Sequence, residues 1–209
     1  LLENETSTTG MYVLVAGHLG DAIQAYSARD VADGDAGGHF MIAGNISDAH
    51  NGLENTGNGC NCNGRTVLDG VTGIDTFTVG SVPYGIAAAN TDDGIQVFSL
   101  RNPFQIIPNA NATKAETGFE LLDGANDVKT WNSGGSPHAI ISADQSDAVT
   151  VVKLAGVTET CSDESCLEVT DTLSTGDGPN IALDGANRIE LFTVGEFQYA
   201  AVTSNGTGG

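Results

Sequence analysis

Short runs of apolar residues recur along most of the chain, and each is followed by a turn and by a segment in which apolar and polar residues alternate. The clearest copy runs from Leu122 to Lys153. It opens with Leu-Asp-Gly, continues through a β-type run that ends at Trp131, turns at two glycines and resumes at His138. Short runs with a period of two are typical of strands joined by tight turns. The pattern therefore predicts an all-β chain built from a structural repeat.

The repeat has three recognisable parts. Leu-Asp-Gly occurs at residues 68–70, 122–124 and 183–185. A hairpin of constant length, made of an apolar strand, an aspartate turn and an alternating strand, is predicted at Tyr12–Tyr26, Tyr84–Phe98 and His138–Val152. Aromatic residues, or a histidine in place of one, recur at equivalent positions that we expect to pack between repeats: Tyr12, Phe77, Tyr84, Trp131, His138, Phe192 and Tyr199. Trp131 also enters a glycine turn, where its indole has room to remain exposed.

Other segments of each unit also have strand character. Segments with one polar and one apolar face are predicted as strands at Gly73–Phe77, Asp127–Trp131 and Arg188–Phe192. A further strand is expected at Phe40–Ala43, Gly118–Leu121 and Leu167–Thr170. About four antiparallel strands in roughly 40 to 60 residues correspond to one blade of a β-propeller. We therefore predict propeller-type repeats, three blades plus the start of a fourth, with a β-sandwich as the alternative.

The domain organisation follows from the repeat. Residues 1–9 are polar and without period, which indicates a tail or linker, and residues 10–209 are expected to form a single repeat domain. The predicted repeats span about 10–80, 81–134 and 135–195, with a partial repeat at 196–209. A closed propeller needs at least four blades. We therefore expect either a fragment of a larger propeller or a propeller completed by other copies of the chain.

One repeat carries a resemblance to known proteins. Pro83–Asn90 followed by Gly94–Phe98 resembles the blades of secreted YVTN and lactonase-like propeller proteins, and Pro137–Asp144 is similar with His138 in place of tyrosine. The resemblance covers most of residues 10–209 and implies a propeller fold. It implies no specific activity, because proteins of one fold carry many functions. No motif identifies counterparts of the metal-binding carboxylates of lactonase-type propellers.

The chain is strongly acidic, with 27 acidic and 7 basic residues and a formal net charge of −20 at pH 7. This charge repels phosphate backbones and anionic lipid surfaces, so we expect no nucleic acid partner and no anionic membrane partner. No apolar run approaches the roughly 20 residues that span a bilayer, so no membrane span is expected. The acidity fits a solvated surface, a salt-rich or cation-rich medium, or loops that hold Ca²⁺.

The four cysteines form two close pairs in polar loops, Cys60 with Cys62 and Cys161 with Cys166. Disulfides are the favoured interpretation, which indicates an oxidising, extracellular compartment. Three connectivities are open, and we favour 161–166 together with, by elimination, 60–62, although adjacent pairing of Cys60 and Cys62 requires strained geometry. A zinc site is the weaker alternative because the spacing differs from that of zinc motifs.

Two further groups of residues are candidate modification or binding sites. Sequons in expected tails or loops predict N-glycosylation at Asn4, Asn45, Asn111 and Asn205. Calcium is the cofactor that the aspartate loops suggest, since hard cations need several oxygens from one loop, and the candidate ligands are Asp30, Asp33, Asp35, Asp92 and Asp93. Neither aspartate loop has the spacing of an EF-hand, and Asp-Gly pairs are also ordinary turn residues.

Catalytic motifs are not recognisable. The histidines are scattered and no Gly-x-Ser-x-Gly elbow occurs, so we predict no catalytic residues and no enzyme activity. We predict a structural or interaction module of an extracellular or cell-surface glycoprotein, adhesive or filament-forming, whose partners are other copies of itself or further blades. The alternatives are a metal-dependent lactonase-like hydrolase and a propeller that binds a glycan or protein ligand.

Overall fold

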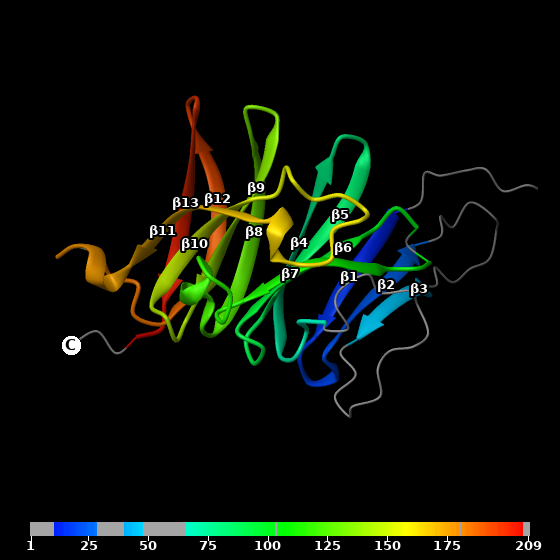
Figure 1. The fold of residues 1–209 in the computed structure, drawn as a ribbon, viewed down its shortest axis with the longest axis horizontal. Helices are drawn as coiled ribbons and strands as arrows, with labels where there is room; N and C mark the ends of the chain where they lie inside the picture. Colours follow the sequence, from blue (N-terminus) through cyan, green and yellow to red (C-terminus); the bar gives the residue numbers. More distant parts are fainter. Residues whose placement is uncertain (1–10, 29–39, 48–65, 103, 180, 207–209) are drawn as a thin grey trace, which may run out of the picture.

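The computed structural model describes residues 11–28, 40–47, 66–102, 104–179 and 181–206. These residues form short strands, turns and brief 3₁₀ segments arranged as four antiparallel sheets that follow one another along the chain (Figure 1). The all-β prediction is confirmed, and the succession of antiparallel sheets is consistent both with propeller-type blades and with the sandwich alternative. Among the described residues, the helical segments are too short and too polar to pass through a lipid bilayer.

We name the sheets blades 1 to 4 in chain order. Blade 1 has three strands: β1 (Met11–Gly17), β2 (Ala22–Ala28) and β3 (Phe40–Ser47). Blade 2 has four: β4 (Val71–Val79), β5 (Val82–Ala89), β6 (Gly94–Ser99) and β7 (Ile107–Thr113). Blade 3 has four: β8 (Ala125–Ser133), β9 (Ser136–Ala143), β10 (Ala148–Lys153) and β11 (Glu168–Ser174). The described part of blade 4 has two: β12 (Ala186–Val194) and β13 (Phe197–Ser204).

The sheets divide the chain at different points from the predicted repeats. The sequence interpretation placed the Trp131 strand at the end of one blade and His138 at the start of the next, but β8 pairs directly with β9 and Trp131 lies opposite His138. The turn between them consists of Gly134 and Gly135, with φ of 58° and 82°. Two successive residues with positive φ make the tight turn that joins paired strands. Each complete blade therefore begins just after its Leu-Asp-Gly triplet.

The fourth strand of blade 2 was also predicted in the wrong place. Gly118 and Phe119 precede η3 (Glu120–Leu122), which takes up the rest of the predicted strand, and the fourth strand is β7 instead. Phe119 and Leu122 are nevertheless buried, so their apolar signal marks the core and not a strand. The segment that became β7 contains small alanines and a proline, which give a weak strand signal. The other two predicted fourth strands correspond to β3 and β11.

The core lies in three layers, each between successive blades. Residues of β5, β6 and β7 pack against β8, β9 and β10 in the largest layer, between blades 2 and 3. Ile23 and Ile46 of blade 1 pack against Phe98 of blade 2 in a second layer. Gly85 makes room for the Phe98 ring, since a Cβ at that position would lie 2.2 Å from the ring. In the third layer, Ile140 of blade 3 contacts the β12 side of blade 4. Burying each sheet face therefore requires the neighbouring blade.

Three cross-strand ring pairs repeat along the chain. The rings of Phe77 and Tyr84, of Trp131 and His138, and of Phe192 and Tyr199 stack at centroid distances of 5.6, 5.4 and 5.6 Å. Their exposure rises toward the C-terminus. Tyr84 is 2% exposed under blade 3, the Trp131 pair is half-buried, and Tyr199 is 46% exposed. His138 thus occupies the tyrosine position of the repeat. The remaining residue of this series, Tyr12, is 40% exposed and packs edge-on against Phe104.

This gradient in ring exposure predicts that replacing tyrosine by alanine at two equivalent positions lowers the free energy of unfolding by different amounts. Tyr84→Ala removes a fully buried ring and is expected to lower the free energy of unfolding by about 3 kcal/mol. Tyr199→Ala removes a ring that is half in solvent and should cost no more than about 1 kcal/mol. Urea unfolding of the two variants measures both values. Equal losses would contradict the view that blade 3 covers the first pair while the third pair is open.

Candidate functional site

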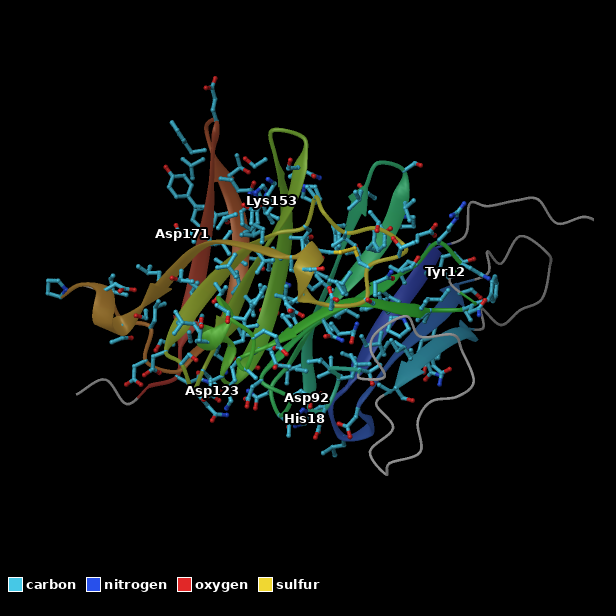
Figure 2. All side chains as sticks on the ribbon, viewed as in Figure 1. Tyr12, His18, Asp92, Asp123, Lys153 and Asp171 are labelled. Atoms are coloured by element: carbon cyan, nitrogen blue, oxygen red, sulfur yellow. A yellow bond between two sulfur atoms is a disulfide. The ribbon has the colours of Figure 1, made fainter. Side chains whose placement is uncertain are left out.

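The turns at one end of the sheets contain the aspartates that recur with the repeat, including the calcium candidates Asp92 and Asp93. Figure 2 shows His18, Asp92 and Asp123 at this end of the molecule, which we call the turn face. Two kinds of loop meet there. One is the strand turn, which joins β1 to β2, β5 to β6 and β9 to β10, and the other is the Leu-Asp-Gly turn that precedes β4, β8 and β12. The chemistry of the turn face depends on how these two loops bind each other.

An aspartate in each strand turn accepts a hydrogen bond from the next blade. These aspartates have positive φ, a conformation that the short polar side chain of aspartate tolerates better than most. Each carboxylate accepts from the backbone N–H of the glycine in the following Leu-Asp-Gly. The three bonds are Asp21 Oδ1 to Gly70 N (3.0 Å), Asp93 Oδ1 to Gly124 N (2.9 Å) and Asp147 Oδ1 to Gly185 N (2.7 Å). The repeated turn aspartate therefore links successive blades.

The glycine of Leu-Asp-Gly is required by both conformation and space. Gly124 has φ of 71°, and a Cβ there would lie 2.1 Å from Oδ1 of Asp144. Its carbonyl accepts from Asp144 N at 3.0 Å, and the carbonyl of Asp123 accepts from the next two backbone N–H groups of the strand turn. The triplet thus binds the strand turn of its own blade through backbone groups while its glycine N–H binds the preceding blade.

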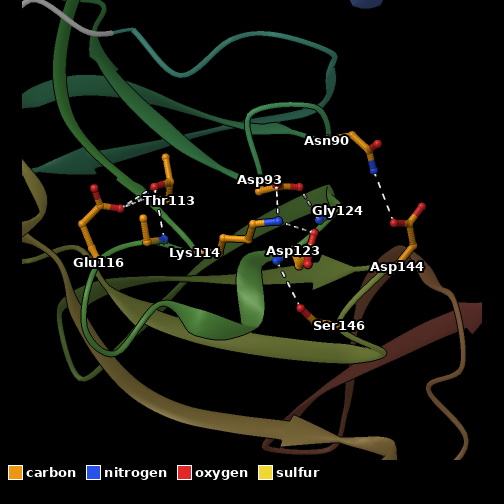
Figure 3. Close-up of polar contacts among 10 residues, drawn as sticks. Asn90, Asp93, Thr113, Lys114, Glu116, Asp123, Gly124, Asp144 and Ser146 are labelled. Atoms are coloured by element: carbon orange, nitrogen blue, oxygen red, sulfur yellow. Dashed lines mark hydrogen bonds and ion pairs between the residues drawn. The ribbon is translucent and has the colours of Figure 1, made fainter.

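The predicted calcium ligands Asp92 and Asp93 have other partners. Asp92 Oδ2 accepts from Asp69 N at 2.9 Å. Asp93 uses one oxygen for Gly124 N and the other for the ammonium group of Lys114, at 2.6 Å, and Lys114 also pairs with Asp123 at 2.9 Å (Figure 3). The two carboxylates therefore serve different contacts between loops and do not converge on a shared cation position.

Lys114 determines the protonation behaviour of this cluster. Burial alone would raise the pKa of Asp93, but the Lys114 ammonium and the Gly124 N–H outweigh burial and hold the pKa below its ordinary value of 3.8. The hydrogen bonds to Asp93 and Asp123 raise the pKa of Lys114 above its ordinary value. Asp93 is therefore stabilised in its charged form.

The remaining calcium candidates, Asp30, Asp33 and Asp35, lie outside the described residues. Within the described part of the chain, no three His, Cys, Asp or Glu side chains are grouped closely enough to hold a metal ion.

A second polar contact joins blades 2 and 3 on the turn face. Asn90 and Asp144 are the first residues of equivalent strand turns, and Asn90 Nδ2 donates to Asp144 Oδ1 at 3.4 Å (Figure 3). Asn126 Nδ2 donates to the other oxygen of Asp144 at 3.5 Å. His18 and Asn205 occupy the corresponding position in blades 1 and 4. These long bonds make Asp144 a further link between the strand turns.

The cysteine prediction is supported for one pair. Cys161 and Cys166 form a disulfide with their Cα atoms 6.2 Å apart, in the loop between β10 and β11. Cys161 is buried against the largest core layer, so the disulfide fixes a loop that packs on blade 2 and blade 3 residues. Cys60 and Cys62 lie outside the described residues.

The predicted glycosylation sites differ in their surroundings. Asn45 and Asn111 lie within the outer strands β3 and β7, and not in loops as predicted. Each lies opposite a glutamine of the neighbouring strand, Gln24 or Gln96, so the two sequons occupy the same register position. Asn45 is exposed and Asn111 is half-buried. Asn205 is exposed, and its backbone N–H donates to the Gly185 carbonyl. Asn4 lies outside the described residues.

A groove of about 310 Å³ lies where the first strands of blades 3 and 4 meet. Its lining residues come from β8, β12 and β13 and are Asp127, Lys129, Arg188, Ile189, Glu190, Ala201 and Thr203. Asp127 is 5% exposed and both of its oxygens are used, one by Val128 N and one by Ile189 N, each at 2.9 Å. This carboxylate therefore aligns β8 with β12. Because both of its oxygens are engaged, the groups of the groove that stand out are the basic side chains of Lys129 and Arg188.

Sequence reasoning did not identify the groove. The strands that contain Lys129 and Arg188 were predicted only from their alternating polar and apolar residues. The two basic residues occupy different positions of the repeat, so the repeat gave no reason to group them. A signal was nevertheless present, because the chain has only seven basic residues and each of them is unusual against the acidic background.

The hydrogen bond from Gly185 N to Asp147 predicts that two substitutions of Asp147 lower the free energy of unfolding by different amounts. Asp147→Ala leaves the Gly185 N–H without its acceptor and places alanine at a φ of 51°, so the free energy of unfolding should fall by about 2 to 4 kcal/mol. Asp147→Asn keeps an acceptor and tolerates this conformation, so it should cost about 1 kcal/mol or less. Asp171→Ala, on exposed β11, is the control with the same loss of charge. Chemical denaturation of the three variants decides whether the bond matters.

The lowered pKa of Asp93 predicts acid sensitivity with a definite sign. The charged form is favoured in the folded state, so Asp93 contributes its full stabilisation above its ordinary pKa of 3.8 and loses it as the pH falls through the lower folded-state pKa. The difference in unfolding free energy between the natural chain and Asp93→Asn should therefore shrink as the pH is lowered from 6 toward about 2. A difference that stays constant over this range would contradict the assignment.

Comparison with known proteins gives limited similarity. No protein-family model matches the chain, and no curated protein matches it in sequence. Among solved structures, a protein from Lactobacillus plantarum determined by the Northeast Structural Genomics Consortium is similar with a TM-score of 0.49 and 15% sequence identity. The match covers 92% of this chain and 53% of that protein, so the chain spans about half the length of its structural neighbour.

Proposed function

We propose that the chain is an interaction module of an extracellular protein, and that the open face of blade 4 is its contact surface. The observation that carries this proposal is the exposure of large apolar side chains on one face of the β12–β13 hairpin. Phe192, Val194, Phe197 and Tyr199 are 46, 57, 69 and 46% exposed. Contiguous exposed apolar groups of this size are a common mark of contact with another protein.

The repeat indicates what kind of partner fits this face. In blade 2 the equivalent ring pair, Phe77 and Tyr84, is buried by residues of the following blade, including Val128 and Ile141. The outer edge of β13 is also unpaired among the described strands, whereas the equivalent edges of β5 and β9 pair with β6 and β10. A partner with an apolar sheet face and a strand that extends the hairpin would complete the same interface. The fitting partner is therefore another β-sheet of the blade type.

Binding fits the described residues better than catalysis does. The turn-face carboxylates of Asp21, Asp93 and Asp147 accept backbone hydrogen bonds, and Asp93 is also paired with Lys114. Groups engaged in this way stabilise the scaffold. The Cys161–Cys166 disulfide supports an extracellular location, because disulfides persist in oxidising compartments.

The proposal predicts association through blade 4. The double variant Phe192→Ser and Phe197→Ser should abolish concentration-dependent association of the chain in sedimentation velocity, because a second copy can supply a blade-type sheet in this experiment. The loss of stability should stay within about 1 kcal/mol, since both side chains are exposed.

The matched control replaces exposed apolar residues elsewhere. Leu19 and Phe104 are 95 and 62% exposed but lie away from blade 4, so the double variant Leu19→Ser and Phe104→Ser should associate as the natural chain does. A natural chain that stays monomeric at every concentration, or equal association of both double variants, would overturn the assignment of this face.

A further inference from the structure

The groove between blades 3 and 4 is lined by two basic side chains that form no ion pair within the described residues. Five of the seven basic residues lie in the described part of the chain, with Arg29 and Arg65 outside it. Three of the five are ion-paired: Arg101 with Glu159, Lys114 with Asp93 and Asp123, and Lys153 with Glu168. The other two, Lys129 and Arg188, form no ion pair within the described residues, and both line the groove. In a chain with a net charge of −20, this convergence is unexpected.

The strand geometry brings the two cations to one place. The hydrogen bond from Ile189 N to Asp127 Oδ2 sets β8 beside β12. Lys129 is two residues after Asp127 and so shares its face of β8. Arg188 directly precedes Ile189 on β12 and so lies on the opposite face of that strand, which it shares with Glu190, and both cations reach the groove at the β12 edge. The negative charge of Asp127 is held by two backbone N–H groups. The cations therefore face an open groove in which Glu190 is the remaining acid.

We propose that this groove binds a small oxyanion, the carboxylate, sulfate or phosphate group of a ligand, through Lys129 and Arg188. Arginine presents a planar fork of N–H donors that matches two oxygens, and lysine adds a compact charge. The Thr203 hydroxyl, which accepts from Arg188 N at 3.2 Å, retains its own O–H as a neutral donor. A volume of about 310 Å³ is at the lower end of the range for small-molecule sites. Glu190 lies on the same face of β12 as Phe192, so the groove adjoins the apolar contact surface proposed above, but the anion proposal does not rest on that surface.

The test is a titration of the full chain with acetate, sulfate, phosphate and glucuronate, followed by NMR chemical shifts at constant ionic strength. Glucose and sodium chloride serve as the uncharged and the non-oxyanion probes. We expect saturable shifts at the groove for at least one oxyanion and none for glucose. Comparison of the four oxyanions shows which head group the site prefers. Absence of saturable binding up to about 50 mM for all four would overturn the proposal.

Affinities of substituted chains distinguish a specific anion site from a general effect of the protein's charge. Lys129→Gln and Arg188→Gln should each weaken binding about tenfold, because each removes a charge-assisted hydrogen bond. Lys153→Gln and Arg101→Gln remove the same charge from ion-paired positions outside the groove and should leave affinity unchanged. Glu190→Gln, which removes the competing acid, should tighten binding about two- to threefold. Equal weakening by all four substitutions of basic residues would show that the anions act only through the net charge of the protein.

Discussion

The hydrogen bond between a turn aspartate and the glycine N–H of the next blade is the contact on which the repeated architecture depends. Asp21, Asp93 and Asp147 make this bond in turn, and each joins loops that are separated by at least thirty residues of sequence. The bond needs an aspartate that tolerates positive φ and a glycine without a side chain. These two conformational requirements explain why the same short motifs recur along the chain.

The second constraint is burial, because each sheet needs its neighbouring blades to cover its two faces. Each core layer is shared by two successive blades, so the stability of one blade depends on the next. Blade 2 is covered on both sides and contains the most deeply buried side chains, including Tyr84 and Phe98. Blade 4 is covered on one side, and its outer ring pair is exposed. The exposed apolar face of blade 4 therefore arises from the same repeat that forms the core.

The acidic side chains of the described residues occur in two kinds of surroundings. Some carboxylates are engaged by the scaffold, as Asp93 is by Gly124 and Lys114 and as Asp127 is by two backbone N–H groups. Others, such as Asp171 and Glu190, lie exposed to solvent. Because so many acids surround few bases, a basic side chain without an acidic partner is the unusual feature. Lys129 and Arg188 share this property and one groove, which gives the inner strands of blades 3 and 4 a chemistry distinct from that of the turn face.

The sequence by itself determined the elements that depend on neighbouring residues. Alternation predicted β4, β8 and β12, the glycine and aspartate positions predicted the turns, and the repeat identified His138 as a variant of the tyrosine position. Contacts between distant segments were decided only by the tertiary structure. These include the pairing of β8 with β9, the choice of Ile107–Thr113 as the fourth strand, the use of Asp93 to join blades, and the meeting of Lys129 with Arg188 in a groove. Local patterns record backbone preference and burial, whereas the partner of a side chain depends on which distant strand packs against it.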